Sequence, residues 1–133
     1  MPLFLLHAVL MGAGFLLALS GMLIAMTQRR KRWWLKVHRI VGLTGTAAML
    51  LGAAAAVAAV ASLPKPHHFG TPHTWVGALT VTLAAGASAL GLLQFRIPAK
   101  AASFRAFHRL AGRLVNLIAP IAILMGLRAA EII

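Results

Sequence analysis

Histidine is the residue type in this chain best suited to chemistry, because neutral imidazole binds metals and changes charge near neutral pH. Six histidines occur, and four of them lie near the N-terminal ends of four separate apolar segments: His7, His38, His73 and His108. Ionisable residues inside membrane-spanning segments are rare and mark functional sites by default. One such histidine could equally be a packed, hydrogen-bonded residue or an interfacial anchor. Four of them, one near the start of each segment, favour a shared role.

The apolar segments that carry these histidines predict the fold. Hydrophobic residues make up 61% of the 133 residues, charged residues make up 11%, and the mean hydropathy is +0.90. Each segment approaches or exceeds the ~20 residues that a helix needs to cross the hydrocarbon core, where backbone groups must be paired within the segment. Short connections make successive helices antiparallel neighbours. The sequence therefore predicts an all-α membrane protein, a single domain over residues 1–133, folded as an antiparallel bundle of four transmembrane helices at approximately 3–27, 35–63, 72–95 and 103–132.

The charge distribution predicts the orientation of this bundle. The formal net charge is +12, and Glu131 is the only acidic residue. Six basic residues lie at 29–39 and five at 96–113, whereas the connection at 62–72 contains only Lys65. By the positive-inside rule, the first and third connections face the cytoplasm and both termini face outward. We therefore expect an integral membrane protein, in the inner membrane if the source is bacterial, whose basic surface meets anionic lipid headgroups and not nucleic acid.

The absence of cysteine narrows the chemistry that the histidines can perform. Without thiolates the chain cannot hold disulfides, iron–sulfur clusters, thiolate-ligated haem or covalently attached c-type haem. Non-covalent haem remains, because two neutral imidazoles from opposed helices can occupy both axial positions of the iron. With both positions filled, oxygen does not bind at the iron. This favours electron transfer, and no side chain is predicted to be catalytic.

The direction of the helices predicts which histidines pair. The first and third helices start at the outer face, so His7 and His73 should bind the iron of an outer haem. The second and fourth start at the inner face, so His38 and His108 should bind the iron of an inner haem. Along a helix the two levels differ by roughly fourteen residues, or about 20 Å. Two haem b cofactors are therefore expected, close enough for electron relay.

Small and basic residues beside the histidines fit a large planar ligand. Gly42, Gly77 and Gly112 each follow a histidine by four residues, which places them on the same helix face and clears space for haem packing. Arg39 and Arg109 directly follow the two inner histidines and are candidates for contacts with haem propionates. Ordinary close packing explains any one glycine equally well, and positive-inside anchoring explains each arginine equally well.

Taken in order, these motifs resemble the four-helix core of the cytochrome b561 family over nearly the whole chain. The third-helix segment is the most specific, because in the family a His-Phe pair precedes a run of the His-Ser-Trp-Leu-Gly type. The matching segments are His7-Ala-Val-Leu-Met11, Lys36-Val-His38-Arg, His68-Phe69-Gly-Thr-Pro-His73-Thr-Trp75-Val-Gly77 and Phe107-His108-Arg-Leu-Ala-Gly112, with Gly126-Leu127 and Glu131 after them.

The resemblance implies haem ligation by histidine pairs from core helices one and three and from two and four. It also implies electron transfer from a cytoplasmic donor, often ascorbate, to an outer acceptor such as monodehydroascorbate or a ferric chelate. Lys36 and Arg105 are the nearest equivalents of the basic residues that bind ascorbate in the family. His68 would lie near the outer substrate site, although a solvated loop histidine explains it equally well. The chain departs from the family pattern, because many members have six spans and no clear ascorbate signature is present here. A quinol or a protein donor therefore carries comparable weight.

The sequence thus predicts a b561-like transmembrane oxidoreductase, similar to ferric reductases, with two haem b groups. Its donor would be ascorbate or quinol, and its acceptor a ferric chelate, monodehydroascorbate or a protein. The alternative is a cytochrome b membrane-anchor subunit that relays electrons between the quinone pool and a partner redox protein. A homodimer is also compatible with the sequence. A histidine-based transporter of protons or metal ions has less support, because Glu131 near the terminus is the sole acidic residue.

Overall fold

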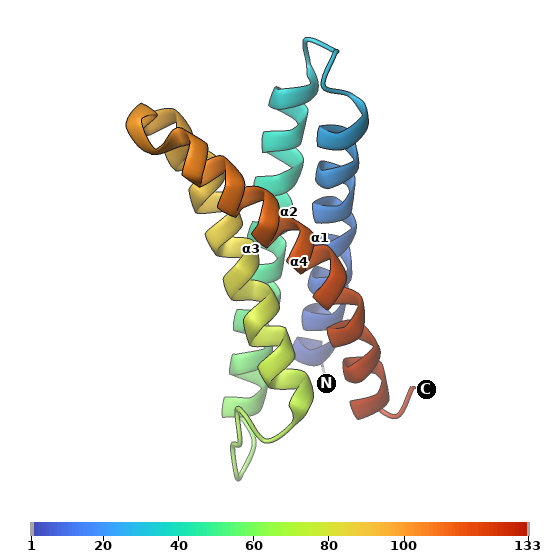
Figure 1. The fold of residues 1–133 in the computed structure, drawn as a ribbon. Coiled ribbons are helices and arrows are strands. Elements are labelled where there is room, and N and C mark those ends of the chain that lie inside the picture. The colour runs from blue at the N-terminus through green and yellow to red at the C-terminus, as the bar shows by residue number, and fades with distance from the viewer. Residues whose placement is uncertain (1, 133) are drawn as a thin grey trace.

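The computed structural model describes residues 2–132, and all regular structure in them is helical. The helices are α1 (Pro2–Thr27), α2 (Trp34–Ala61), α3 (Pro72–Arg96) and α4 (Ala101–Ala129), with a short 3₁₀ helix, η1 (Pro98–Lys100), before α4 (Figure 1). Each of the four long helices is long and apolar enough to cross a membrane. The predicted fold class, an all-α bundle of four transmembrane helices, is confirmed.

Prolines decide where the third helix begins and ends. α3 begins at Pro72, in the first helical turn, where the missing N–H of proline is not needed. It ends at Arg96 because the residue before Pro98 is driven out of the helical region, and Ile97 has φ −126° and ψ 80°. The chain then turns through η1, which was not predicted. α2 ends two residues earlier than predicted, and α4 begins two residues earlier and ends three earlier.

The helices form two hairpins with little contact between them. α1 packs mainly against α2, and α3 packs mainly against α4, whereas contacts of α2 with α3 and of α1 with α4 are sparse. Figure 1 shows the hairpins crossing at an angle and separating toward one end. That end, named here the basic end, holds the α1–α2 and α3–α4 connections. The opposite end, named the terminal end, holds the α2–α3 connection and both ends of the chain (Figure 1).

Glycine permits the close approach of α1 and α2. A Cβ built at Gly14 would lie 2.7 Å from Cγ of Met49 and 2.9 Å from the carbonyl oxygen of Gly45. Both distances are shorter than van der Waals contact, so a larger residue would push the two helices apart. Small residues commonly serve this purpose in membrane bundles, because they let helix backbones come close together.

The outside of the bundle is apolar and the buried core is small. Met49 is fully buried (0% exposed) and packs with Ala84 and Val115, whereas Leu16 and Leu117 are 61% and 67% exposed. A soluble domain would not leave so many large apolar side chains in water, but lipid solvates them. The chain is therefore an integral membrane protein.

Candidate haem-binding sites

The structure brings four histidines together as two pairs, at two levels between the hairpins. The ring centroids of His7 and His73 are 6.1 Å apart, and those of His38 and His108 are 5.8 Å apart. Each pair takes one ring from each hairpin, and the two ring planes are nearly perpendicular, at 79° and 90°. These are the pairs that helix direction predicted, one toward the terminal end and one toward the basic end.

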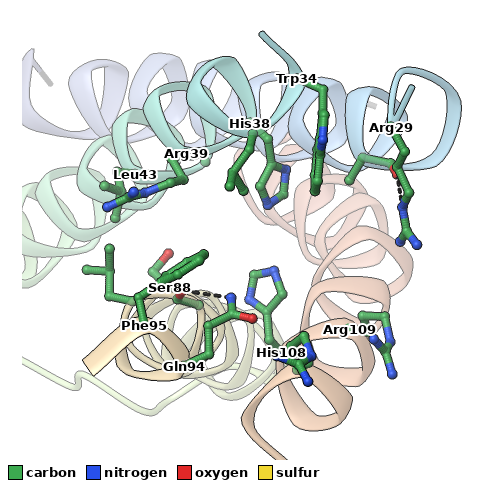
Figure 2. Close-up of a pocket in the computed structure, with 16 residues that line it drawn as sticks. Arg29, Trp34, His38, Arg39, Leu43, Ser88, Gln94, Phe95, His108 and Arg109 are labelled. Carbon is green, nitrogen blue, oxygen red and sulfur yellow. Dashed lines mark hydrogen bonds between the residues drawn. The ribbon is translucent and has the colours of Figure 1, made fainter. Parts of the chain in front are cut away.

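The spacing of each pair fits a single metal ion held between two imidazole nitrogens. Metal–imidazole nitrogen distances of about 2 Å place two opposed ring centroids about 6 Å apart when the metal lies between them. Figure 2 shows His38 and His108 pointing toward one another from α2 and α4. Within residues 2–132, no cluster of three or more histidine, cysteine, aspartate or glutamate side chains could hold a metal ion. Two imidazoles per metal suit haem iron, whose remaining ligands come from the porphyrin.

Each of these histidines is also held by one backbone hydrogen bond across its own hairpin. A carbonyl oxygen can only accept, so Nδ1 carries the hydrogen and Nε2 keeps its lone pair for a metal. Bonds of this kind orient metal-binding imidazoles and raise their basicity. The Nδ1 donors and carbonyl acceptors are His7 and Gly52 at 2.9 Å, His38 and Gly21 at 2.8 Å, His73 and Ala122 at 2.9 Å, and His108 and Ala87 at 2.7 Å.

These hydrogen bonds show that the separation between the two histidine levels is the same along all four long helices. In each long helix the histidine and the accepting residue are fourteen residues apart, as from His7 to Gly21 in α1 and from His73 to Ala87 in α3. Fourteen residues are close to four helical turns of about 3.6 residues, so both groups lie near one face of the helix and about 21 Å apart. This agrees with the separation predicted between the two histidine levels.

The two hairpins are equivalent halves, which was not predicted from the sequence. When the numbering of α3 is aligned on α1 at their histidines, the accepting residues coincide, and the same holds for α4 on α2. The segment His-Arg-x-x-Gly, which opens at both His38 and His108, was the visible sign of this repeat. Buried residues coincide too: Gly14 with Thr80, Gly21 with Ala87, Gly45 with Val115, Met49 with Ala119 and Gly52 with Ala122.

Two glycines that sequence reasoning missed make room for the imidazoles. A Cβ built at Gly91 would lie 3.0 Å from Nδ1 of His108, and one at Gly126 would lie 2.9 Å from Cε1 of His73. Each glycine comes four residues after the carbonyl that accepts the hydrogen bond. Because helical side chains lean over the preceding turn, a side chain at this position lies close to that carbonyl and to the ring bound to it. In the first hairpin the same offset is filled by alanine, at 25 and 56.

The three glycines predicted to clear space for haem face open space. Nothing lies within 4 Å of a Cβ built at Gly42, Gly77 or Gly112. Gly42 also lines a cavity beside His38. An open glycine one helical turn from a ligating histidine is what a flat ligand requires, so the residues present fit a haem here.

The cavity at the basic end has a volume of about 380 Å³ and surrounds the pair His38 and His108 (Figure 2). Its aromatic lining includes Phe95 and Trp34, and the Trp34 ring centroid lies 6.1 Å from that of His38. Apolar walls with a few convergent polar groups are typical of cofactor sites. The cationic groups that line the cavity are the four arginines Arg29, Arg39, Arg105 and Arg109.

Only some of the basic residues that were predicted from the sequence line the cavity. Arg39, Arg105 and Arg109 line it, whereas Lys36 does not. Arg29 lines it as well and was not singled out. It belongs to a run of four basic residues at 29–32, and such a run by itself indicates only membrane orientation. Its place at the cavity depends on tertiary packing, which brings Arg29 and residues of α4 to the lining of the same cavity.

At the terminal end, His68 lies in the α2–α3 connection with its side chain exposed. The adjacent Phe69 packs against Trp75, with ring centroids 4.6 Å apart, which ties the connection to the first turn of α3. Both aromatic rings are more than half exposed, at 55% and 62%. Exposed aromatic rings at a helix end are typical of the membrane interface. The role of His68 in an outer substrate site stays a prediction.

One polar pair joins the hairpins between the two histidine levels. The hydroxyl oxygens of Thr46 and Ser88 are 2.7 Å apart and link α2 to α3. In the repeat, Asn116 of α4 is equivalent to Thr46 and Met22 of α1 is equivalent to Ser88. This second pair cannot form the same bond, because a methionine side chain cannot donate a hydrogen bond. Nδ2 of Asn116 donates to the carbonyl of Gly112 at 2.8 Å, while its Oδ1 is buried without a partner in the described part of the chain.

Comparison with known proteins agrees with this arrangement. The family described as eukaryotic cytochrome b561 matches residues 6–133, which is nearly the whole chain. No curated protein and no solved structure matches it. This family consists of transmembrane oxidoreductases that transfer electrons and bind haem b. Four apolar helices, two facing pairs of histidines and this match together show that the chain belongs to the cytochrome b561 family.

Proposed function

We propose that this chain transfers electrons across the membrane through two b haems, one between His7 and His73 and one between His38 and His108. One repeated arrangement carries the proposal. Each imidazole faces a partner ring at 5.8 or 6.1 Å and donates Nδ1–H to a backbone carbonyl of its own hairpin. Histidines that served only packing would have no reason to repeat this bond at both levels of both hairpins.

The residues around each site determine how it would work. Haem, when bound, supplies a one-electron centre at its iron. Nε2 of the two histidines at each site would hold the iron, and ligation by two imidazoles favours electron transfer over oxygen binding. The carbonyl bonds at Nδ1 hold each ring in one orientation, so little rearrangement accompanies a change of charge.

The spacing of the two levels suits an electron relay. Fourteen residues separate histidine and acceptor in each long helix, which corresponds to about 21 Å along the helix axis. A porphyrin extends well beyond its iron, so two haems at these levels would have edges much closer than their irons. Two such centres together would cover most of the thickness of the hydrocarbon core, which is about 30 Å.

The basic end is proposed to face the cytoplasm, as the positive-inside rule predicts. A donor would then approach the site of His38 and His108, where four arginines line the cavity. A cationic cavity attracts an anionic reductant such as ascorbate. Quinol would reach the same site from the membrane. The acceptor, a ferric chelate, monodehydroascorbate or a protein, would react at the terminal end near His68.

Haem content and the selective loss of one haem test the proposal. Purified protein is expected to show a reducible b-type spectrum with two haems per chain. His38→Ala and His108→Ala should each remove the basic-end haem and keep the other, and His7→Ala and His73→Ala should do the reverse. His67→Ala, in the exposed connection, is the matched control. A colourless preparation after adequate haem supply would contradict the proposal, as would loss of only the terminal-end haem in His38→Ala.

Reduction kinetics would identify the class of donor. If ascorbate is the donor, Arg105→Gln should slow its reduction of the protein, and the rate should fall as ionic strength rises because charges are screened. Lys100→Gln removes a charge at the basic end outside the cavity and serves as the control. Fast reduction by quinol that is insensitive to both salt and Arg105→Gln would instead assign the donor to the membrane.

A further inference from the structure

The cavity at His38 and His108 lies between equivalent halves of the molecule but has two unequal sides. One side is formed by α2 and α3, and Leu43 and Phe95 line it. The equivalent positions hold Arg113 on α4, which is exposed and does not line the cavity, and Arg29 just after α1, which does line it. At both positions the repeat places an apolar residue on the α2/α3 side and a cation on the α1/α4 side.

Figure 2 shows this difference around the two imidazoles. Arg29 and Arg109 lie on one side, whereas Arg39, Leu43 and Phe95 lie on the other. The guanidinium carbon of Arg39 is 5.3 Å from the centroid of the Phe95 ring. A guanidinium over an aromatic face is stabilised there without an anion. The positive charge that still calls for an anionic partner therefore lies on the α1/α4 side.

The chain itself supplies no carboxylate to these arginines. Its only acidic residue, Glu131, follows the C-terminal end of α4, whereas Arg109 is in the first third of that helix. Arg29 donates from Nε to the carbonyl of Ala25 at 2.6 Å, which uses one of its five N–H donors. The side chains of Arg29 and Arg109 are exposed at the basic end. Both guanidinium groups are therefore available to an anionic group from outside the chain.

Arg113 extends this positive side toward the middle of the membrane. It follows Arg109 by one helical turn on the same face of α4. Its equivalent in α2 is Leu43, which lines the cavity. Arg113 itself is exposed and does not line the cavity, so it would reach a group at the level of His108 only by extending its side chain back toward the helix N-terminus.

We propose that the basic-end haem binds in one rotational orientation, with both propionates on the α1/α4 side between Arg29, Arg109 and Arg113. This inference rests on the proposed role of His38 and His108 as haem ligands. Propionates are the only anionic groups that haem carries, and charge-assisted bonds between carboxylate and guanidinium are among the strongest hydrogen bonds in proteins.

The histidines alone would not choose this orientation. Two axial imidazoles leave a porphyrin free to rotate about the axis that joins them, and both come from equivalent positions of the repeat. The rotational orientation of the haem is instead decided by the difference between the apolar and the cationic side of the cavity. The apolar edge of the macrocycle packs against Leu43 and Phe95, and the carboxylate edge faces the arginines, which satisfies both sets of groups at once.

Redox titration of single-residue variants tests the charge part of the inference. Arg29→Phe and Arg113→Leu copy the apolar side of the cavity onto the cationic side. Each removes a positive charge that favours the reduced haem, so the equilibrium constant for reducing the basic-end haem should fall about tenfold, which is about 59 mV for one electron. The terminal-end haem should not change. Arg96→Leu removes a charge from the same end outside the cavity and is the matched control.

Proton NMR of the oxidised protein tests the orientation itself, because the haem methyl resonances depend on how the porphyrin is rotated. A haem with both propionates on one side can still bind in two forms, related by a flip about the axis that runs between the propionates, so the wild type should show at most two sets of resonances for the basic-end haem. The double variant Arg29→Phe with Arg113→Leu should show additional sets, since its two sides are alike. An unchanged spectrum together with unchanged potentials would overturn the inference and would assign Arg113 to lipid headgroups.

Arg113→Lys, which keeps the charge, and Arg113→Gln, which removes it, are the variants to use if Arg113→Leu folds or loads poorly. The potential of Arg113→Lys should lie close to that of the wild type, and a shift as large as that of Arg113→Gln would contradict the charge argument. Failure of the two proposals can be told apart. A wild type without haem refutes the proposed function, whereas two bound haems that are insensitive to Arg29 and Arg113 refute this inference alone.

Discussion

His108 donates its Nδ1 hydrogen to the carbonyl oxygen of Ala87 at 2.7 Å, and Gly91, one turn further along α3, leaves the space in which the ring lies. His73 makes the same arrangement with α4 through Ala122 and Gly126. In the second hairpin each imidazole thus depends on two features of the neighbouring helix, a carbonyl that points at Nδ1 and a missing side chain beside it, whereas in the first hairpin alanine occupies that position at 25 and 56. Neither feature is a chemical group that a sequence displays.

Replacing Gly91 should disturb one haem site and spare the other. A Cβ at this position would lie 3.0 Å from Nδ1 and 3.1 Å from Cε1 of His108, so Gly91→Val must push the ring away from Ala87. We expect reduced haem content and a higher potential at the basic end only, measured by redox titration, because an imidazole without its carbonyl bond is less basic and stabilises ferric iron less. Gly86→Val is the control, because nothing lies within 4 Å of its Cβ. Equal spectra and potentials in the two variants would show that the His108 ring does not depend on the space left by Gly91.

Filling the open space beside His38 should exclude haem without unfolding the chain. Nothing lies within 4 Å of a Cβ at Gly42, and this residue lines the cavity. Gly42→Phe should therefore keep the helical circular dichroism and lose about one haem of the two expected, because the aromatic ring occupies the porphyrin space. Gly86→Phe places the same side chain in a groove between α3 and α4 that contains no histidine. Full haem content in Gly42→Phe would show that the space serves another purpose.

The polar pair Thr46 and Ser88 should stabilise the contact between the hairpins, whereas Asn116 should not. Hydrogen bonds between transmembrane helices contribute about 0.6 kcal/mol on average and up to about 1.7 kcal/mol. Thr46→Val should lower the free energy of unfolding by about that amount. Asn116→Leu removes a buried acceptor that has no partner, so it should leave stability unchanged or raise it. Unfolding in mixed detergents measures both, and the opposite order would show that Asn116 Oδ1 binds a group such as water or haem.

Gly14 should be among the least replaceable residues of the first hairpin. A Cβ there would lie 2.9 Å from the carbonyl oxygen of Gly45, a backbone atom that cannot rotate away. Gly14→Val should destabilise the protein by about 1–3 kcal/mol, the usual range for overpacking. Gly12→Val, with nothing within 4 Å of its Cβ, should have little effect in the same unfolding assay. A similar loss of unfolding free energy in the two variants would show that the lower helix propensity of valine, and not overpacking, causes the destabilisation.

Much of the fold and the histidine pairing could be predicted because they depend on local properties of the chain. The length of an apolar segment decides whether it can span a membrane, and short connections force neighbouring spans to run antiparallel. Direction then sorts the histidines by depth. For this reason His7 could be matched with His73, and His38 with His108, and the structure brings these same pairs together.

The remaining features depend on how far each helix is rotated about its axis and how closely it approaches its neighbour, and neither quantity is local. The acceptor carbonyls belong to residues such as Gly52 and Ala122, whose side chains carry no chemical signal. Arg29 joined the cavity and Lys36 did not, although both are basic residues near the same membrane surface. Sequence alone therefore determined which residues lie at each depth. Tertiary packing decided which groups meet there, because contact across a bundle requires a rotation and a distance that only the assembled helices define.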